Sequence, residues 1–580
     1  MSKRQLQQSQ GRNTKKPRNE DSSKSSSCQK REMKKERQSN RRHAETVVEA
    51  KGLWNKLRLK SNTPEETKEL MQQVMKLVRG KVNEISLQHD ASRVVQAAVQ
   101  FGSDAQRKEL LLEIVKEQGA LAELSKIQYA HFLALKFIKY CAKDRECVKM
   151  IVKSFKGHMP KLAVHAVGSR IVESIFVNLP PRETSMLKQE FYGPHFSLFA
   201  GNTKGAPTLK SSLESAKTEV QKGSVRKFVK EIVNKGITKS FFGYFFFQGL
   251  LAELIDVSEP GDIQELAPTL ADHSIHLLST RAGSRVVAAI ASYGTPKDRK
   301  RICKSLKGYT ASSLLHRDAY LALIRLVQVT DDTVSIHKSI LNEILTAQKG
   351  KEEGTVEKVL VDLASSDTAS KFFLFLLSPD NESRMKYFDP YERSILEPIP
   401  EIKGVCTYKK EPCARRQELL KYMKQHLVDM CTANPNHLLG SVPGFRVLKE
   451  VYSNFGTDEL VAAIMAICES AIGKETLDEK LSVFEDPTRH RAIKNLIVCD
   501  STKDDPVFAT TFFERLEWGL MKVSNSNRGA FVVAALFKVK PLRPKLVKVL
   551  KPQRQMITSL SKKGKANAGY NALLKELSSH

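Results

Sequence analysis

A short helical motif that recurs along the chain constrains its fold more than any other feature. It first occurs as "DASRVVQ", Asp90–Gln96, and its counterparts are "YAHFLALKF", "AVGSRIVES", "RAGSRVVAA", "RDAYLALIR", "VPGFRVLKE" and "NRGAFVVAA". Aligned on Arg93, the first three copies centre on residues 93, 132 and 170, which are 39 and 38 residues apart. A fixed period of about 20 to 50 residues is typical of repeat architectures.

Later copies continue the series with wider gaps, where insertions would lie. Between Arg170 and Arg285 there is room for two divergent copies, near Thr208 and Phe246. The remaining centres are Leu321, Lys371, Arg446, Arg491 and Ala530, which gives about eleven units. Amphipathic helical periods dominate from Trp54 onward without an alternating strand pattern, and one such unit cannot bury its apolar face alone. We therefore predict an all-α fold built as an α-solenoid.

The motif places a narrow polar face on an otherwise apolar helix. Ser92, Arg93 and Gln96 fall within one arc of the helix, while Val94 and Val95 lie outside it. On one helix this arc would be read as an ordinary solvated edge. Because the arc recurs in other copies of the motif, that interpretation is less favoured.

Several stretches resemble the pumilio-repeat family, and within it the nucleolar branch typified by Puf-A. They are "LWNKLRLK" (Leu53–Lys60), "GKVNEISLQHDASRVVQ" (Gly80–Gln96), "SFKGHMPKLAVHAVGSRIVE" (Ser154–Glu173) and "EPCARRQELLKYM" (Glu411–Met423). The last resembles the C-terminal extension of that branch. The resemblance covers the chain from Leu53 onward and implies a right-handed α-solenoid of about eleven pumilio-type helical repeats.

The resemblance also implies roles for the polar arc. In ordinary pumilio repeats each helix offers two side chains to the edge of one base and a third that stacks on it. Transferred to this chain, Ser92 and Gln96 would read a base edge and Arg93 would stack. Ser169, Glu173 and Arg170 form a second such set.

Most other copies lack the second edge reader. Leu135, Ala288, Ile324 and Lys449 occupy its place. An array that reads two of about eleven positions does not specify a long sequence. We therefore expect largely sequence-independent binding.

The charge of the chain points to a polyanionic partner. The formal net charge is +30, and basic residues concentrate in Lys204–Lys239, Lys297–Lys307 and "KVKPLRPKLVKVLKPQRQ". Lysine and arginine contacts to phosphates give affinity with little sequence preference. Besides the two polar sets, we predict RNA contacts at Lys156, His158, Lys161, Lys210, Arg226, Lys227, Arg285, Arg299, Lys300 and Arg301.

Composition divides the chain into three parts. Residues 1–45 are polar and basic, which predicts a disordered tail. We assign residues 46–360 to an N-terminal repeat array and residues 361–580 to C-terminal pumilio-like repeats with insertions and a basic tail. The tail's nuclear-localisation candidates are Lys15, Lys16, Pro17, Arg18, Lys34, Lys35, Arg41 and Arg42.

The sequence gives no sign of catalysis, metal binding or membrane insertion. The nine cysteines lack the CxxC spacing that metal and redox sites prefer, and there is no Gly-rich phosphate loop. The apolar run Phe241–Ile255 is too short to span a bilayer and is expected to pack in the core. We expect a soluble intracellular protein that needs no cofactor, binds no metal and is not an enzyme.

Together these features predict an RNA-binding scaffold for structured RNA. The RNA part follows from charge and repeat type. A role in nucleolar pre-rRNA processing and large ribosomal subunit assembly, with pre-ribosomal protein partners and a location in the nucleus and nucleolus, is implied only by the resemblance. The alternatives are a sequence-specific mRNA-binding translational repressor and a protein-binding α-solenoid adaptor, and DNA is a further possible ligand.

Overall fold

The computed structural model describes residues 44–89, 91–193, 208–345, 355–473, 483–563 and 567–579. These residues are almost all helical, and their one sheet is a hairpin of β1 (Glu401–Ile402) and β2 (Val405–Cys406). The predicted all-α class is confirmed. The predicted basic tail and its localisation candidates from Lys15 to Arg42 lie outside the described residues.

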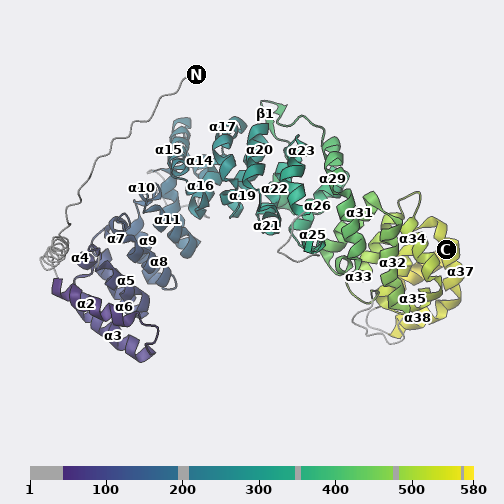
Figure 1. The fold of residues 1–580 in the computed structure, drawn as a ribbon, viewed down its shortest axis with the longest axis horizontal. Coiled ribbons are helices and arrows are strands. Elements are labelled where there is room, and N and C mark those ends of the chain that lie inside the picture. Colours follow the sequence, from purple (N-terminus) through teal and green to yellow (C-terminus); the bar gives the residue numbers. More distant parts are fainter. Residues whose placement is uncertain are drawn as a thin grey trace, which may run out of the picture. The chain divides into compact units, whose positions relative to one another are not determined.

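The chain forms two compact units, each a stack of helical repeats (Figure 1). Unit 1 takes the described residues within 1–208 and 223–228, and unit 2 takes those within 209–222 and 229–580. The helices of unit 1 are α2 (Ala44–Leu57), α3 (Pro64–Val78), α4 (Val82–Ser86), α5 (Ser92–Phe101), α6 (Asp104–Val115), α7 (Ala120–Leu124), α8 (His131–Tyr140), α9 (Arg145–Phe155), α10 (Met159–Ala163), α11 (Ser169–Asn178), α12 (Pro181–Gln189) and the 3-10 turn η1 (Glu190–Tyr192).

A repeat consists of a first helix, a short helix and a last helix. In unit 1 the series α3–α4–α5, α6–α7–α8 and α9–α10–α11 shows this order, and α5 packs on α8, which packs on α11. We call these last helices the reader row of unit 1, because they carry the motif. Their spacing confirms the repeats that the sequence predicts at Arg93, Phe132 and Arg170.

Unit 2 continues the same construction. Its reader row consists of α14 (Leu209–Ser215), α16 (Phe245–Asp256), α19 (Arg281–Tyr293), α22 (Ala319–Val329), α26 (Ala369–Leu377), α31 (Val442–Phe455), α33 (Arg489–Asp500), α36 (Asn527–Leu536) and α39 (Ala568–Ser579), each packed on the next. The predicted centres from Phe246 to Ala530 lie in these helices, and Thr208, at the end of unit 1, directly precedes α14. Only α39 was not predicted.

The other helices of unit 2 precede or connect those of its reader row. They are α15 (Glu219–Thr238, of which 223–228 cluster with unit 1), α17 (Pro260–Leu270), α18 (Ser274–Leu277), α20 (Pro296–Ser305), α21 (Thr310–Leu315), α23 (Thr333–Ile336), α24 (Asn342–Leu345), α25 (Thr355–Ser365), α27 (Asn381–Met385), α28 (Pro390–Leu396), α29 (Pro412–Ala433), α30 (Pro435–Leu439), α32 (Asp458–Gly473), α34 (Val507–Leu516), α35 (Leu520–Ser524), α37 (Arg543–Leu550) and α38 (Arg554–Lys563).

A recurring carboxylate fixes three of the short helices, α4, α10 and α21, to the element that follows the repeat. The backbone N–H groups of Gly157 and Met159 donate to the Glu190 carboxylate at 2.7 and 3.1 Å, and Gly157 has the positive φ of 84° that glycine tolerates. Equivalent pairs of N–H groups donate to Glu113 and Glu343. These bonds satisfy the exposed start of the short helix and set the stacking of consecutive repeats.

Two glycines at the start of last helices, Gly283 of α19 and Gly529 of α36, are required by close packing. A Cβ atom on Gly283 would lie 1.9 Å from the carbonyl oxygen of Leu277, six residues earlier, and one on Gly529 would lie 2.0 Å from that of Val523. Neither approach is possible for a larger residue without moving the backbone. Each glycine therefore lets its last helix start directly against the short helix.

One insertion interrupts the repeats of unit 2. Between α26 and α29 the chain forms α27, α28 and the β1–β2 hairpin, whose turn residues Lys403 and Gly404 both have positive φ. Asp389 caps α28, since its side chain accepts from Glu392 N while Glu392 accepts from Asp389 N. We call residues 386–411 the inserted segment.

The apolar run predicted to be core is confirmed as core. In α16 the side chains of Phe246, Phe247 and Leu251 are buried, while Phe245 remains 48% exposed. Among the described helices, none combines the length and apolarity needed to cross a bilayer.

Candidate nucleic-acid interface

Unit 1 exposes a cation, an aromatic ring and a second cation on three successive helices of its reader row. Arg93 of α5 and Arg170 of α11 are exposed, and Phe132 of α8 is 46% exposed. Burial lowers the pKa of His131, and the charge of Arg170 lowers it further, so the motif of α11 lies close to that of α8. The three side chains therefore present equivalent positions of adjacent repeats.

The two arginines of this row are available to a ligand. Neither guanidinium has a side-chain hydrogen bond or ion pair within the part of the chain that the structure describes. Planar guanidinium and phenyl groups both stack on nucleobases, and guanidinium also binds phosphate. Arg93, Phe132 and Arg170, which we call the open stacking row, suit unpaired bases and their phosphates.

The side chains expected to read base edges are less exposed than the open stacking row. Ser92 and Ser169 are fully buried, which corrects the expectation that their hydroxyl groups face a base. The Gln96 amide donates to Ser92 Oγ at 3.0 Å and to the carbonyl oxygen of Tyr129 at 3.2 Å. These serines open the last helix, where packing within the array covers them. Ser92 Oγ accepts the Gln96 bond, whereas Ser169 Oγ is buried without a hydrogen-bond partner among the described residues. Gln96 and Glu173 are half-buried.

The equivalent positions at the centre of unit 2 are covered by protein. On α22, Leu321 is 4% exposed and Ile324 is fully buried. The inserted segment covers them, since the Glu392 carboxylate accepts a hydrogen bond from the Tyr320 hydroxyl and pairs with Lys371 of α26. Glu392 itself is 3% exposed.

Aromatic rings of the inserted segment form cation–π contacts with other cations of these helices. The Arg281 guanidinium lies 3.6 Å from the Tyr391 ring centroid, and Arg446 lies 5.9 Å from that of Tyr387. Arg285, the equivalent of Arg93 in α19, pairs with Asp256. The centre of the unit 2 row thus has internal partners, whereas Arg93 and Arg170 of unit 1 have none within the described residues.

A buried arginine anchors the inserted segment farther along α22. Arg325 donates to the carbonyl oxygens of Leu396 at 3.1 Å and Pro398 at 2.7 Å, and Gln328 donates to Leu396 O at 2.9 Å. Burial lowers the pKa of Arg325 to about 10. The carbonyl partners stabilise a charge that burial would otherwise disfavour.

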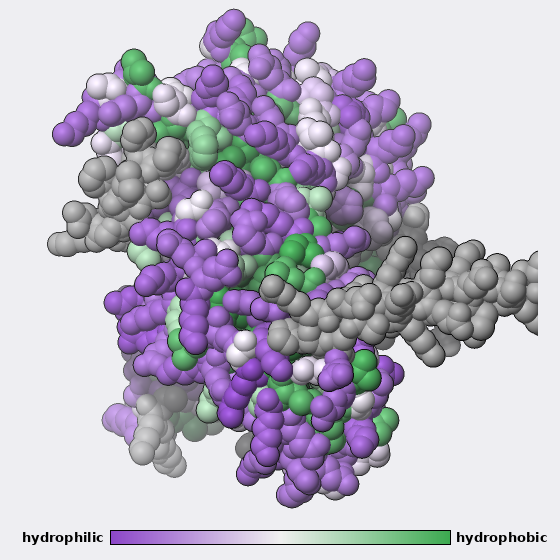
Figure 2. All heavy atoms as spheres, turned by 90° about the vertical axis from the view of Figure 1, so that its left-hand side faces the viewer, coloured by the Kyte–Doolittle hydropathy of each residue, from purple (hydrophilic) through white to green (hydrophobic). Residues whose placement is uncertain are grey.

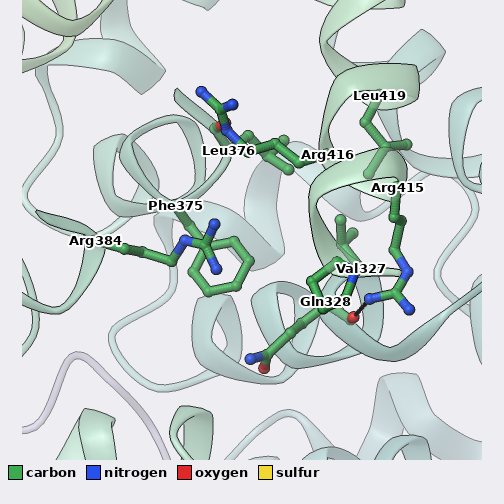
Figure 3. Close-up of a pocket in the computed structure, with 9 residues that line it drawn as sticks. Val327, Gln328, Phe375, Leu376, Arg384, Arg415, Arg416 and Leu419 are labelled. Carbon is green, nitrogen blue, oxygen red and sulfur yellow. Dashed lines mark hydrogen bonds between the residues drawn. The ribbon is translucent and has the colours of Figure 1, made fainter. Parts of the chain in front are cut away.

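Three arginines surround a small cavity near α22, α26 and α29 (Figure 3). Its volume is about 20 Å³, room for little more than one water molecule. Arg416 donates to Leu376 O at 2.7 Å and to Asn454 Oδ1 at 2.9 Å, while Arg415 pairs with Asp331 at 3.0 Å. These guanidinium groups cap helix ends rather than line a ligand site.

Arg299 was predicted to contact RNA, and the structure contradicts this. The side chain is 1% exposed and donates to Ala291 O at 2.8 Å and to Thr407 Oγ1 at 2.8 Å. Arg107 does the same in unit 1, where it donates to Val99 O at 2.9 Å. Both arginines lie four residues after an N-cap and bind the end of the preceding last helix, a recurrence that the sequence already contained.

The other predicted basic contacts differ in accessibility. Arg301 forms two hydrogen bonds to Asp272, which raises its pKa, so its charge is already compensated. Lys126 and, to a lesser degree, His158 and Lys161 lower the pKa of Glu123, which places these cations near a carboxylate. His158 is half-buried. The exposed members are Lys156, Lys161, Lys210, Arg226, Lys227 and Lys300.

Phe132 is the functional candidate that the site prediction omitted. Its position in the repeat was the available signal, but Leu135 in the place of the second edge reader removed Phe132 from the predicted set.

Hydrophilic side chains cover most of the face of the molecule on the α2–α6 side, with apolar groups in narrow strips (Figure 2). Among the described residues, no group of three His, Cys, Asp or Glu is arranged to hold a metal.

Comparison with known proteins agrees with this geometry. The CPL (NUC119) domain model matches residues 365–506, which contain the inserted segment. Pumilio homolog 3 of Rattus norvegicus is 27% identical over 559 residues, covering 94% of this chain and 82% of the relative. Pumilio homology domain family member 6 of Schizosaccharomyces pombe is 26% identical over 467 residues, covering 79% of this chain and 66% of the relative.

Two solved structures have the same fold over almost the whole chain. The crystal structure of human Puf-A superposes with a TM-score of 0.76 at 25% identity and covers 92% of this chain and 100% of that chain. The structure of human Puf-A in complex with DNA gives a TM-score of 0.75 at 25% identity, covering 92% and 99%.

Proposed function

The chain belongs to the Puf-A-like branch of the pumilio-repeat family, and on that premise we propose that it is a scaffold protein that binds structured RNA largely without reading its sequence. It acts by binding rather than by catalysis. Human Puf-A has been crystallised with DNA, so a ligand lacking the 2′-hydroxyl is compatible with this type of array.

One observation carries the proposal. The open stacking row keeps the residue types that stack on bases, while Ser92 and Ser169, which would distinguish one base from another, are buried. Stacking tolerates every base, because each has a π-face. The open stacking row therefore binds unpaired segments of an RNA without selecting a sequence.

Phosphate contacts supply the remaining affinity. The net charge of +30 and exposed lysines such as Lys210 and Lys227 favour polyanions over a broad surface. Sites of this kind suit a long folded RNA, which presents many phosphates and some unpaired loops.

The biological setting that we propose is the nucleolus. The branch resemblance supports a role in pre-rRNA processing and large ribosomal subunit assembly, alongside pre-ribosomal proteins. The basic residues from Lys15 to Arg42 suit nuclear import. The buried edge readers count against sequence-specific repression of mRNA.

Gel shifts over a salt series test the binding mode. We expect unrelated single-stranded and structured RNAs to bind with similar affinity, and the affinity to fall steeply with salt. Failure to bind any RNA at moderate salt would contradict the proposal. A strong preference for one short linear motif would instead indicate the repressor.

Sequencing of RNA crosslinked to the protein in cells tests the setting. We expect reads from precursor ribosomal RNA. Reads from messenger 3′ regions would refute the assembly role while leaving RNA binding intact.

A further inference from the structure

A groove with basic walls and an apolar floor lies between α9 and α12 of unit 1. Its volume is about 400 Å³, within the range of sites that bury a side chain or small ligand. It is lined by Lys149, Val152, Lys153, Lys156, Glu183, Met186 and Leu187. We call it the α9 groove.

The floor of the α9 groove is aliphatic. Val152 is 4% exposed and Leu187 is fully buried, so both belong to the core beneath the groove. Met186 remains 40% exposed above them. A flexible thioether over buried aliphatic groups adapts to an incoming apolar side chain, which would also cover the methionine.

One wall of the α9 groove carries several cations, and not all of them pair with a carboxylate of the described residues. Arg145, Lys149, Lys153 and Lys156 follow one stripe of the helix surface, because they are spaced by four, four and three residues. Arg145 lies 3.9 Å from Glu183. Lys149 and Lys153 have no side-chain hydrogen bond or ion pair within the described residues.

This arrangement is unfavourable in the isolated helix. Like charges four residues apart destabilise a helix, so Lys149 and Lys153 repel each other. Burial raises the pKa of the nearby Glu190, and the charge of Lys156 opposes that shift, so Lys156 already faces a carboxylate. Lys149 and Lys153 are the two cations that an external carboxylate would compensate.

We propose that the α9 groove binds an acidic segment of a partner protein. An aliphatic side chain of that segment enters beside Met186, and flanking carboxylates pair with Lys149 and Lys153. A phosphodiester backbone has charge for the walls but no aliphatic group for the floor, which favours a peptide over nucleic acid. The groove is formed by first helices, whereas the open stacking row lies on last helices, so this inference stands independently of the proposed function.

Selection of peptides tests the proposal. A display library of short random peptides is selected on the full chain and counter-selected on the double variant Lys149→Glu, Lys153→Glu. We expect the retained peptides to combine a Leu, Ile or Met anchor with two or more acidic residues. A synthetic peptide of that consensus should lose at least about tenfold in affinity for the double variant.

Matched variants separate the groove from general charge. Lys56→Glu with Lys60→Glu makes the same charge change on exposed lysines elsewhere in unit 1 and should leave peptide affinity within about twofold. Met186→Ala should weaken the peptide several-fold and leave the melting temperature unchanged. An equal loss in both charge variants would overturn the proposal.

Nucleic acid is the competing occupant, and a polyuridine RNA probe tests it. We expect the double variant to bind this RNA with an affinity within about twofold of the Lys56, Lys60 control. A much larger loss of RNA affinity, or no peptide that depends on Lys149 and Lys153, would refute the peptide site.

Discussion

The same helical position has opposite surroundings in unit 1 and at the centre of unit 2. In unit 1, Arg93, Phe132 and Arg170 are open, whereas in unit 2 Leu321 is buried and Lys371 pairs with Glu392. The repeat scaffold is alike in both. On α22 and α26 the difference comes from the inserted segment, which covers Leu321 and pairs with Lys371 through Glu392.

The inserted segment shows what closing such a face requires. Lys371 pairs with the Glu392 carboxylate, and the Arg281 guanidinium lies against the Tyr391 ring. Arg325 donates hydrogen bonds to two backbone carbonyl oxygens. Burial of a charge is tolerated only with such partners. Charged residues at reader positions are therefore evidence of a nucleic-acid site only where no partner within the chain compensates them.

The largest expected effect is on the closed face. Glu392→Ala leaves Lys371 without its carboxylate in a largely buried position, and we expect the free energy of unfolding of unit 2 to fall by about 3 kcal/mol. Thermal and urea denaturation measure the change. The neighbouring exposed Glu397→Ala is the control and should have little effect. Equal stability of the two variants would show that the pair does not hold the segment.

Removing the open stacking row should have the next largest effect. Arg93→Ala, Phe132→Ala and Arg170→Ala together remove three stacking groups, and we expect RNA affinity to fall by about 2 kcal/mol, roughly thirtyfold. Filter binding at fixed salt measures it. Arg285→Ala with Arg446→Ala, the unit 2 equivalents, should change affinity less than about twofold. A reversed order would break the distinction between the units.

A variant at Arg299 distinguishes a structural role of this side chain from a role in RNA binding. Arg299→Ala removes buried hydrogen bonds to the end of α19 and to Thr407, so we expect a loss of about 1.5 kcal/mol in stability. RNA affinity should not change. Lys300→Ala, at the exposed neighbour, should leave stability unaltered. A drop in RNA affinity for the folded Arg299 variant would restore the prediction made from its sequence.

A single member of the stacking row should matter only modestly. Arg93→Ala alone should weaken RNA binding by about 1 kcal/mol, or fivefold, because the other groups remain. Loss of all binding in a variant that still melts normally would mean that Arg93 does far more than stack.

The smallest effect is expected at a buried edge reader. Ser92→Ala should leave the relative affinities for different RNA sequences within about twofold, since the hydroxyl is fully buried. Competition between RNAs of different sequence measures this. A change in sequence preference would show that Ser92 becomes exposed in the complex.

The sequence was sufficient for the repeats but not for their surroundings. The spacing of Arg93, Phe132 and Arg170 located the last helices because each repeat makes the same local contacts. The burial of Ser92 depends on how the next elements pack, which the motif itself does not contain. The covering of Leu321 depends on Glu392, which lies more than seventy residues later.

Ultraviolet crosslinking of the full chain to a structured RNA, followed by mass spectrometry of the crosslinked peptides, tests the contrast between the two rows directly. We predict crosslinks in the α8 peptide that contains Phe132 and none in α22 or α26. Crosslinks at Leu321 or Lys371 without any in α5, α8 or α11 would contradict the account.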